Sequence, residues 1–318
     1  MKNFRWILRL IGLLLFIVIL RKIDLIKIFM IFSKSNMPMI FFCIIINIII
    51  IYLIRAYKWK ILLASQKIKI SFKEAIIIFF ASLFIGSVTP GRIGELIRIY
   101  YIKRKGFSLG KSSVSIFIDR IQDIIFLVIM GILGLAIFLS IFKKQVMIIS
   151  GTLIIVIVLS IVFILNKKIR LFLYNFFINF LLPNQFRKSF KKNINDFVFD
   201  LSRIKYLILI KTFLLTLLAW FTYYFILFSI AKVMNINMPF IYFVACLSIS
   251  SLVTILPISF SGIGTRDIIF ILIFSKFGLS SESAVAFSAV ILFTYVLTTF
   301  FGLISWLYNP IKMRSKNN

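Results

Sequence analysis

Long apolar runs dominate this sequence of 318 residues. An α-helix needs about 20 apolar residues to cross the hydrocarbon core of a bilayer. Runs that reach or approach this length lie at residues 6–20, 38–54, 114–140, 146–165, 206–231 and 284–307. Apolar residues make up 62% of the chain and charged residues 15%, whereas soluble proteins have about 45–50% and about 25%. The sequence therefore predicts an all-α polytopic integral membrane protein.

Two further apolar stretches, 75–101 and 240–277, are interrupted by Pro, Gly and charged residues. The interruptions are TPGRIGELIR at 89–98 and LPISFSGIGTRD at 256–267. Non-helical backbone at membrane depth is tolerated only where protein or a water-filled cavity covers it. We expect about six full spans plus two broken, re-entrant hairpins of opposite orientation, with eight conventional spans as the alternative. Such paired breaks are typical of the midplane site of a transporter.

The chain has 38 Lys and Arg against nine Asp and Glu, a net charge of +29. The basic residues lie in short loops beside apolar runs, so they indicate topology and contact with anionic lipid rather than nucleic-acid binding. The charge bias predicts cytoplasmic termini in the plasma membrane, with cytoplasmic loops that include the stretch from Arg55 to Lys73. The first span lacks the small residues of a signal-peptide cleavage site and is expected to be uncleaved. We interpret 1–318 as one membrane domain with a basic cytoplasmic or interfacial segment at 166–205.

The first interruption has the features of a helix start inside the membrane. Thr89 is a candidate N-cap, and Pro90 suits the first helical position. Free N–H groups at such a start attract phosphate. Arg92, Glu95 and Arg98 follow at spacings of three, which places them along one face. The alternative is a surface loop whose arginines touch lipid phosphates.

A second charged group lies in the run FIDRIQDIIFLVIM. Asp119 and Asp123 are one helical turn apart, and Arg120 lies about 100° around the helix. Carboxylates inside a membrane span are costly unless paired, so they indicate a functional site. The alternative is that both acids lie near enough to the cytoplasmic interface to reach water.

The third group follows the second interruption, where Gly262 and Gly264 allow close backbone approach and Arg266 and Asp267 open the next helix. Glycines at a helix start beside an arginine suit an anionic ligand. The three groups together hold equal numbers of arginines and carboxylates. We hypothesise that a bound phosphate exchanges with an internal carboxylate, so that neutralising Glu95 or Asp119 abolishes transport without unfolding the protein. The candidate headgroup-binding residues are Thr89, Pro90, Gly91, Arg92, Gly94, Glu95, Arg98, Asp119, Arg120, Asp123, Gly262, Gly264, Arg266 and Asp267.

No histidine is present, and the two cysteines, Cys43 and Cys246, lie inside apolar runs. Histidine-based catalysis is excluded, and we expect no metal, no cofactor and no disulfide. Buried cysteines of this kind act as small apolar side chains.

TPGRIGELIR, IDRIQDIIFLVIMGILGL and LPISFSGIGTRDIIF, in this order, resemble the flippase-like membrane domain of lysylphosphatidylglycerol synthases, the multiple peptide resistance factors, and its stand-alone relatives. The resemblance covers roughly residues 5–308. It implies a domain that moves an aminoacylated phospholipid between leaflets, while a separate soluble domain performs aminoacyl transfer from charged tRNA. The positions it implies as shared are Pro90, Gly91, Gly94, Glu95, Arg98, Arg120, Asp123, Gly262, Gly264 and Arg266.

The sequence departs from the full synthases because it contains no aminoacyltransferase domain, so lysyl transfer is not expected. Arg92 and Asp267 also differ from the residues common in relatives. We therefore expect a lipid flippase or scramblase that acts on phospholipids and is not an enzyme. One alternative is a membrane-embedded lipid-modifying enzyme, for which Asp24 is the only acid in the first outer loop.

The other alternative is a non-catalytic subunit of a lipid synthase. The partner would be a separately encoded lipid-modifying enzyme, docked on the basic segment that holds Arg187, Lys188, Lys191 and Lys192. The sequence does not predict an oligomeric state.

Overall fold

A computed structural model describes residues 23–138, 184–255 and 262–308, and these parts of the chain are helical with no strand. The helices are α2 (Leu25–Lys34), α3 (Met37–Ser65), α4 (Phe72–Val88), the 3₁₀ helix η1 (Pro90–Leu96), α5 (Ile97–Lys103), α6 (Leu109–Ile137), α9 (Asn184–Ser202), α10 (Tyr206–Val233), α11 (Phe240–Ile255), α12 (Thr265–Phe274), the 3₁₀ helix η3 (Ser275–Phe277) and α13 (Ser281–Tyr308). The spans expected at 6–20 and 146–165 lie outside the described residues. The polytopic all-α fold is confirmed.

Four of the described helices, α3, α6, α10 and α13, are long and apolar enough to cross a membrane. They match the expected spans at 38–54, 114–140, 206–231 and 284–307. The match is poorest in α3, which continues to Ser65. Arg55 and Lys58 therefore lie in helix α3, so the sequence-based assignment of these two residues to a loop was wrong. The apolar run ends at the first charge, whereas the helix continues because these charges are paired inside the protein.

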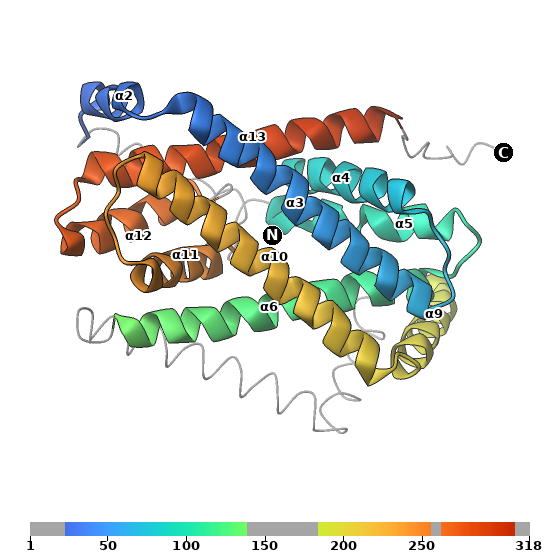
Figure 1. Ribbon diagram of the computed structural model, residues 1–318. Helices are drawn as coiled ribbons and strands as arrows, with labels where there is room; N and C mark the ends of the chain where they lie inside the picture. The colour runs from blue at the N-terminus through green and yellow to red at the C-terminus, as the bar shows by residue number, and fades with distance from the viewer. Residues whose placement is uncertain (1–22, 139–183, 256–261, 309–318) are drawn as a thin grey trace.

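The first interrupted stretch forms a helical hairpin of α4, η1 and α5 (Figure 1). Glu74 in the first turn of α4 makes a 2.7 Å ion pair with Lys105, just after α5. The chain therefore returns to the end of the bundle from which it entered. Thr89 has extended backbone between α4 and η1, at the N-cap position that the sequence predicts. Its Oγ1 accepts the Gly94 N–H at 2.7 Å, beyond the amides that an ordinary N-cap reaches.

The second interrupted stretch forms a hairpin of α11 and α12 at the opposite end of the bundle (Figure 1). Tyr242 near the start of α11 lies 5.1 Å from Phe277 at the end of η3, measured between ring centroids. Gly264 is the N-cap of α12, and Gly262 and Gly264 have φ values of 83° and 80°. These left-handed conformations favour glycine, which explains both glycines at this helix start.

Each hairpin packs against a long helix of the other half of the chain: α4 lies along α13, and α11 lies along α6. Glycines allow these close approaches, which is typical of helix packing in membranes. A Cβ at Gly302 of α13 would lie 2.6 Å from the backbone oxygen of Phe80, and one at Gly134 of α6 would lie 3.0 Å from that of Ala245. Helices α3 and α10 pack against each other. The two halves are therefore interlocked.

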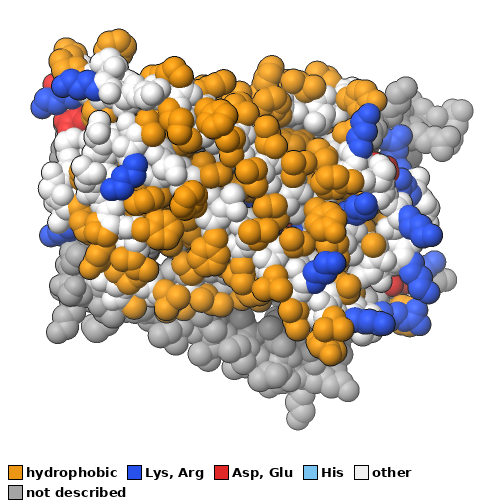
Figure 2. All heavy atoms as spheres, in the orientation of Figure 1, with side chains coloured by type: hydrophobic (Ala, Val, Ile, Leu, Met, Phe, Trp, Pro, Cys, Tyr) orange, Lys and Arg blue, Asp and Glu red, His pale blue; other side chains and the backbone are white. Residues whose placement is uncertain are grey.

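The two ends of the bundle differ in charge. Figure 2 shows apolar side chains over the middle of one face, with Lys and Arg gathered mainly at the end where α3 stops and α6 starts. The described residues at that end include Lys67, Lys69, Lys73, Lys103, Arg104, Lys105, Lys111, Lys191, Lys192, Arg203 and Lys205. At the other end, the described residues include Lys27, Lys34, Lys232 and Lys276. The loops that the sequence assigns to the cytoplasm thus share one end.

Two helices outside the bundle core were not predicted as such. Residues 25–34, expected as an outer loop, form α2, and the Asp24 carboxylate caps it by accepting the Ile26 and Lys27 N–H groups. Helix α9 covers part of the basic segment expected at 166–205. It packs on the start of α6 through Phe197 and Phe117, whose ring centroids are 5.3 Å apart.

Candidate functional site

Charged side chains from α3, η1, α5 and α6 meet inside the bundle. We call this group the ionic cluster; its members are Arg55, Lys58, Glu95, Arg98, Asp119, Arg120 and Asp123. Lys58 and Arg98 are almost completely buried, with side chains 2% and 0% exposed. Unpaired charges would be very costly at such positions, so the carboxylates and cations hold one another in place.

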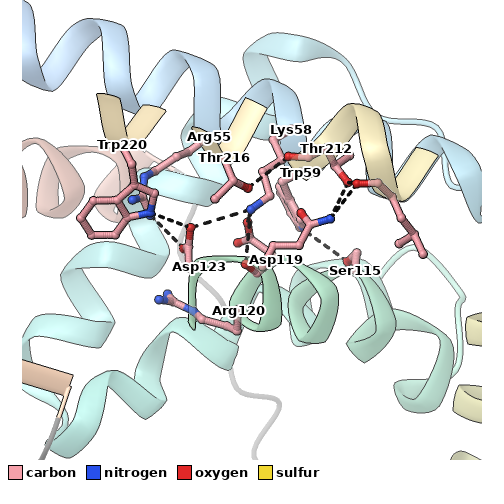
Figure 3. Close-up of polar contacts among 12 residues, drawn as sticks. Arg55, Lys58, Trp59, Ser115, Asp119, Arg120, Asp123, Thr212, Thr216 and Trp220 are labelled. Carbon is pink, nitrogen blue, oxygen red and sulfur yellow. Dashed lines mark hydrogen bonds and ion pairs between the residues drawn. The ribbon is translucent and has the colours of Figure 1, made fainter. Parts of the chain in front are cut away.

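Asp119 is the centre of the cluster. Its Oδ1 lies 2.8 Å from Lys58 Nζ (Figure 3). Its Oδ2 lies 3.1 Å from Arg98 Nη1. Lys58 also donates to the Asp119 backbone oxygen at 3.3 Å. One carboxylate on α6 therefore bridges a cation on α3 and a cation on α5. The sequence-based alternative, in which Asp119 reaches water at the interface, was wrong.

Asp123, one turn further along α6, shares Lys58 with Asp119, at 3.9 Å, and also binds partners of its own. Its Oδ2 lies 3.1 Å from Arg55 Nη1, and its Oδ1 accepts the Trp220 indole N–H at 3.3 Å (Figure 3). The Arg55 guanidinium carbon lies 5.3 Å from the centre of the Trp220 ring. Asp123 thereby ties α3 and α6 to α10.

The broken hairpin supplies Glu95 and Arg98. Arg98 lies against two aromatic rings, with its guanidinium carbon 4.7 Å from the Phe79 ring centre and 5.4 Å from that of Trp59. Glu95 lies 3.9 Å from Arg98 and forms an ion pair with Arg120. Arg120 is the most accessible cation of the cluster, with its side chain 35% exposed.

The ionic cluster holds four cations and three carboxylates, a formal excess of one positive charge. The chain has only nine Asp and Glu, and all nine lie in the described residues. Each carboxylate of the cluster already faces at least one cation. This part of the site is therefore suited to receive an anion.

The third predicted group lies at the start of α12. Arg266 donates from Nε to Ser288 Oγ at 2.8 Å and from Nη2 to the Ser288 backbone oxygen at 3.1 Å. Asp267 accepts one hydrogen bond from the Gly264 N–H, at 2.8 Å, and another from the Ser288 hydroxyl. Asp267 thus acts as a helix cap, and Gly262 and Gly264 shape the turn that leads into α12.

One cavity of about 560 Å³ connects these groups. Of the predicted site residues, it is lined by Thr89, Glu95, Asp119, Arg120, Asp123 and Arg266. Others lie outside its lining, namely Gly94, Arg98, Gly262, Gly264 and Asp267. Pro90, Gly91 and Arg92 belong to η1, but their side chains are outside the described part of the structure. Residues from the two interrupted stretches therefore share one cavity.

Two buried hydrogen-bond donors among the described residues of the cavity lining are unsatisfied. Asn47 Nδ2 and Arg55 Nε are buried donors without a hydrogen-bond acceptor. Buried donors are normally satisfied, so an exception at a cavity wall indicates a ligand or water partner.

The cavity also has an apolar border. Ile93 and Leu96 of η1 and Ile124 of α6 line it and are nevertheless exposed on the molecular surface, Ile93 by 57%. Exposed apolar residues beside a charged cavity suit a ligand with both an apolar and a charged part.

Sequence analysis missed Arg55, Lys58, Asn47 and Trp220 as site residues. A usable signal was present, because Arg55 and Lys58 lie three residues apart on one helix and Asp119 and Asp123 lie four apart on another. Such spacings allow two matched pairs between neighbouring helices. Nothing in the sequence marks Trp220 among the apolar residues of α10.

The described residues contain no group of three or more Cys, Asp or Glu arranged to hold a metal ion. The three carboxylates of the ionic cluster face Lys and Arg instead.

These features define a polytopic helical membrane protein with a charged internal cavity between two opposed hairpins. The chain belongs to the family described as "Lysylphosphatidylglycerol synthase TM region", whose model matches residues 6–302. The match includes all three predicted site groups.

Three similar curated proteins are UPF0104 membrane proteins. The UPF0104 membrane protein MJ1595 of Methanocaldococcus jannaschii is 23% identical over 318 residues, 95% of this chain and 94% of that protein. MJ1078 of the same organism is 27% identical over 70% of this chain and 90% of its own length. The UPF0104 membrane protein PH1989 of Pyrococcus horikoshii is 30% identical over 37% of this chain and 38% of its own length. These names describe membrane proteins and state no activity.

Proposed function

We propose that this protein moves a phospholipid or another phosphorylated lipid between the leaflets of a membrane, as a flippase or scramblase. The observation that carries the proposal is the cavity, which joins a net-positive ionic cluster to an exposed apolar border. A lipid has the matching parts, because its phosphate is anionic and its acyl chains are apolar.

Arg55 and Arg120 are the cations best placed to meet the phosphate, since both line the cavity and keep 21% and 35% of their side chains exposed. Lys58 and Arg98 lie deeper and hold Asp119. Arginine binds phosphate through two parallel N–H donors, which favours it for this role. A phosphate that approaches Arg120 competes with Glu95, so binding and release exchange one anion for another.

The opposed hairpins support a transport role. Broken helices that enter from opposite sides and meet near a charged site are typical of transporters that open alternately to each side. The acyl chains would remain in the bilayer next to Ile93, Leu96 and Ile124 while the head group crosses.

The basic end of the bundle would face the cytoplasm of a plasma membrane, because cytoplasmic loops carry an excess of Lys and Arg. A separately encoded enzyme that modifies lipid head groups would be a natural partner, since it would supply the transported lipid.

The test uses the purified protein in liposomes that contain phosphatidylglycerol labelled with a fluorophore on an acyl chain. Dithionite quenches label in the outer leaflet only, so the fraction quenched reports exchange between leaflets. We expect exchange with the wild type and a fall of at least about tenfold with Glu95→Gln. The lost carboxylate no longer replaces the phosphate at Arg120, and a charge-assisted contact is worth about 1.5–3 kcal/mol.

Glu74→Gln is the matched control, because Glu74 forms an ion pair at the hairpin base away from the cavity lining. It should exchange lipid at the wild-type rate. Equal rates for Glu95→Gln and wild type, with both proteins folded, would contradict the role of the cluster. A new lipid species without exchange would instead indicate an enzyme.

A further inference from the structure

The cavity has a second wall that differs from the ionic cluster. It is formed by hydroxyl-bearing residues of α11 and α13 that line the same cavity, and we call it the hydroxyl wall. Its members are Ser250, Ser251, Thr254, Thr294, Tyr295 and Thr298. Arg266 of α12 also lines the cavity. A lipid whose phosphate lies at Arg55 and Arg120 would direct the rest of its head group into this space.

Each threonine of the hydroxyl wall donates its hydroxyl hydrogen to a backbone oxygen of its own helix. Thr254 Oγ1 donates to the Ser251 backbone oxygen at 2.7 Å, Thr294 Oγ1 to that of Val290 at 2.9 Å, and Thr298 Oγ1 to that of Thr294 at 2.7 Å. Each oxygen retains lone pairs with which to accept a hydrogen bond. These three oxygens therefore suit a ligand group that donates hydrogen bonds, such as a hydroxyl.

A cationic donor is disfavoured in the same space. No carboxylate lines the cavity beyond the three of the ionic cluster, and Asp267 is engaged by Gly264 and Ser288 behind the wall. The remaining acids of the chain are Asp24, Glu74, Asp196, Asp200 and Glu282, and none of them lines the cavity. An ammonium group near the wall would face Arg266 with no carboxylate free to balance it.

We infer that the transported lipid carries, beyond its phosphate, a neutral polyhydroxyl group such as glycerol or a sugar, and not an amine. This inference rests on the proposed function and specifies its substrate. Hydroxyls of a polyol donate to the threonine oxygens and accept from Arg266. The cavity volume of about 560 Å³ lies within the range of about 300–1,000 Å³ usual for small-molecule sites.

The experiment compares acyl-labelled lipids with natural head groups in the same proteoliposomes. Phosphatidylglycerol and phosphatidylinositol carry a linear and a cyclic polyol, phosphatidic acid has no group beyond its phosphate, and lysyl-phosphatidylglycerol carries amines. We expect the two polyol lipids to exchange at least about fivefold faster than the other two. The faster of the two polyol lipids distinguishes a linear from a cyclic polyol head group.

The double variant Thr294→Val, Thr298→Val keeps side-chain volume and removes two acceptor oxygens. In this variant the two polyol lipids should exchange no faster than phosphatidic acid. Thr299→Val is the matched control, because Thr299 makes the same backbone bond, to Tyr295, but does not line the cavity. It should keep the preference in full.

Short-chain forms of the four lipids, added to the detergent-solubilised protein, provide a second readout as shifts in melting temperature. Equal exchange rates and equal shifts for all four lipids would overturn the inference while leaving the proposed function intact. Selective shifts without exchange of any lipid would contradict the proposed function but support a polyol-phosphate site. Faster exchange of the lysyl lipid would overturn the inference.

Discussion

The two hairpins use an arginine in the same way but give it different partners. In the first half, Arg98 of α5 reaches Asp119 on the following long helix, α6, at 3.1 Å. In the second half, Arg266 of α12 reaches Ser288 on the following long helix, α13, at 2.8 Å. One contact is a buried ion pair, and the other is a hydrogen bond to a neutral group.

This difference shows how one scaffold supports two kinds of chemistry. The carboxylates of the first half lie in the cavity wall, where they can exchange with a phosphate. In the second half, the Asp267 carboxylate instead caps the start of α12 by accepting the Gly264 N–H. Hydroxyl groups, and not this carboxylate, therefore line the cavity there. If the proposed function holds, the first half would recognise the charged part of the ligand and the second half its neutral part.

The largest effect on stability is expected for Asp119→Asn. Removal of this carboxylate leaves Lys58 and Arg98 buried without their main partner, and breaking a buried pair costs about 3–5 kcal/mol. Thermal denaturation in detergent measures the loss. This expectation corrects the sequence-based hypothesis that neutralising Asp119 leaves the fold unaffected, and Glu95→Gln is therefore the cleaner test of transport.

A double variant separates charge from shape at this position. Lys58→Met combined with Asp119→Asn removes one cation together with the carboxylate, and it should recover part of the lost stability. If Asp119→Asn alone has the melting temperature of the wild type, the buried ion pair does not stabilise the first half more than the neutral hydrogen bond stabilises the second.

A smaller loss of stability, about 1–3 kcal/mol, is expected for Gly94→Ala. A Cβ at this position would collide with the Ile85 carbonyl and with Thr89 Oγ1, so η1 could not pack on α4. The same denaturation measurement, together with lipid exchange, tests it. Unchanged stability would mean that the break in the first hairpin tolerates a different backbone path.

Ser288→Ala should cost about 1–2 kcal/mol, because it removes the hydroxyl that bonds both Arg266 and Asp267. Arg266 keeps its bond to the Ser288 backbone oxygen, which limits the loss. The melting temperature should fall less than for Asp119→Asn. A larger fall would reverse the ranking of the two halves.

Sequence reasoning identified the fold class and both hairpins because apolar length and Gly/Pro interruptions are local signals. It also found Glu95, Asp119, Arg120, Asp123 and Arg266, since charges stand out in apolar runs. Its hypothesis of balanced arginines and carboxylates was incomplete, because Arg55 and Lys58 also belong to the cluster.

The remaining features depend on tertiary packing. The apolar run of α3 stops before Arg55, and only the approach of α6 shows that the helix carries these charges inward. The hydroxyl wall is similarly hidden, because Ser and Thr are common in apolar helices. Only the folded structure shows that the hydroxyls of α11 and α13 line the same cavity.

The smallest effect is expected at the bases of the hairpins, which the two halves also close differently. Glu74 and Lys105 form a 2.7 Å ion pair whose side chains are 31% and 35% exposed, whereas Tyr242 and Phe277 close the second base by ring contact. Exposed pairs contribute about 0–1 kcal/mol, so Glu74→Gln should lower the melting temperature very little. Raising the salt concentration should reduce even that difference. A loss as large as that of Ser288→Ala would mean that the base of the first hairpin contributes as much stability as the arginine contact of the second hairpin.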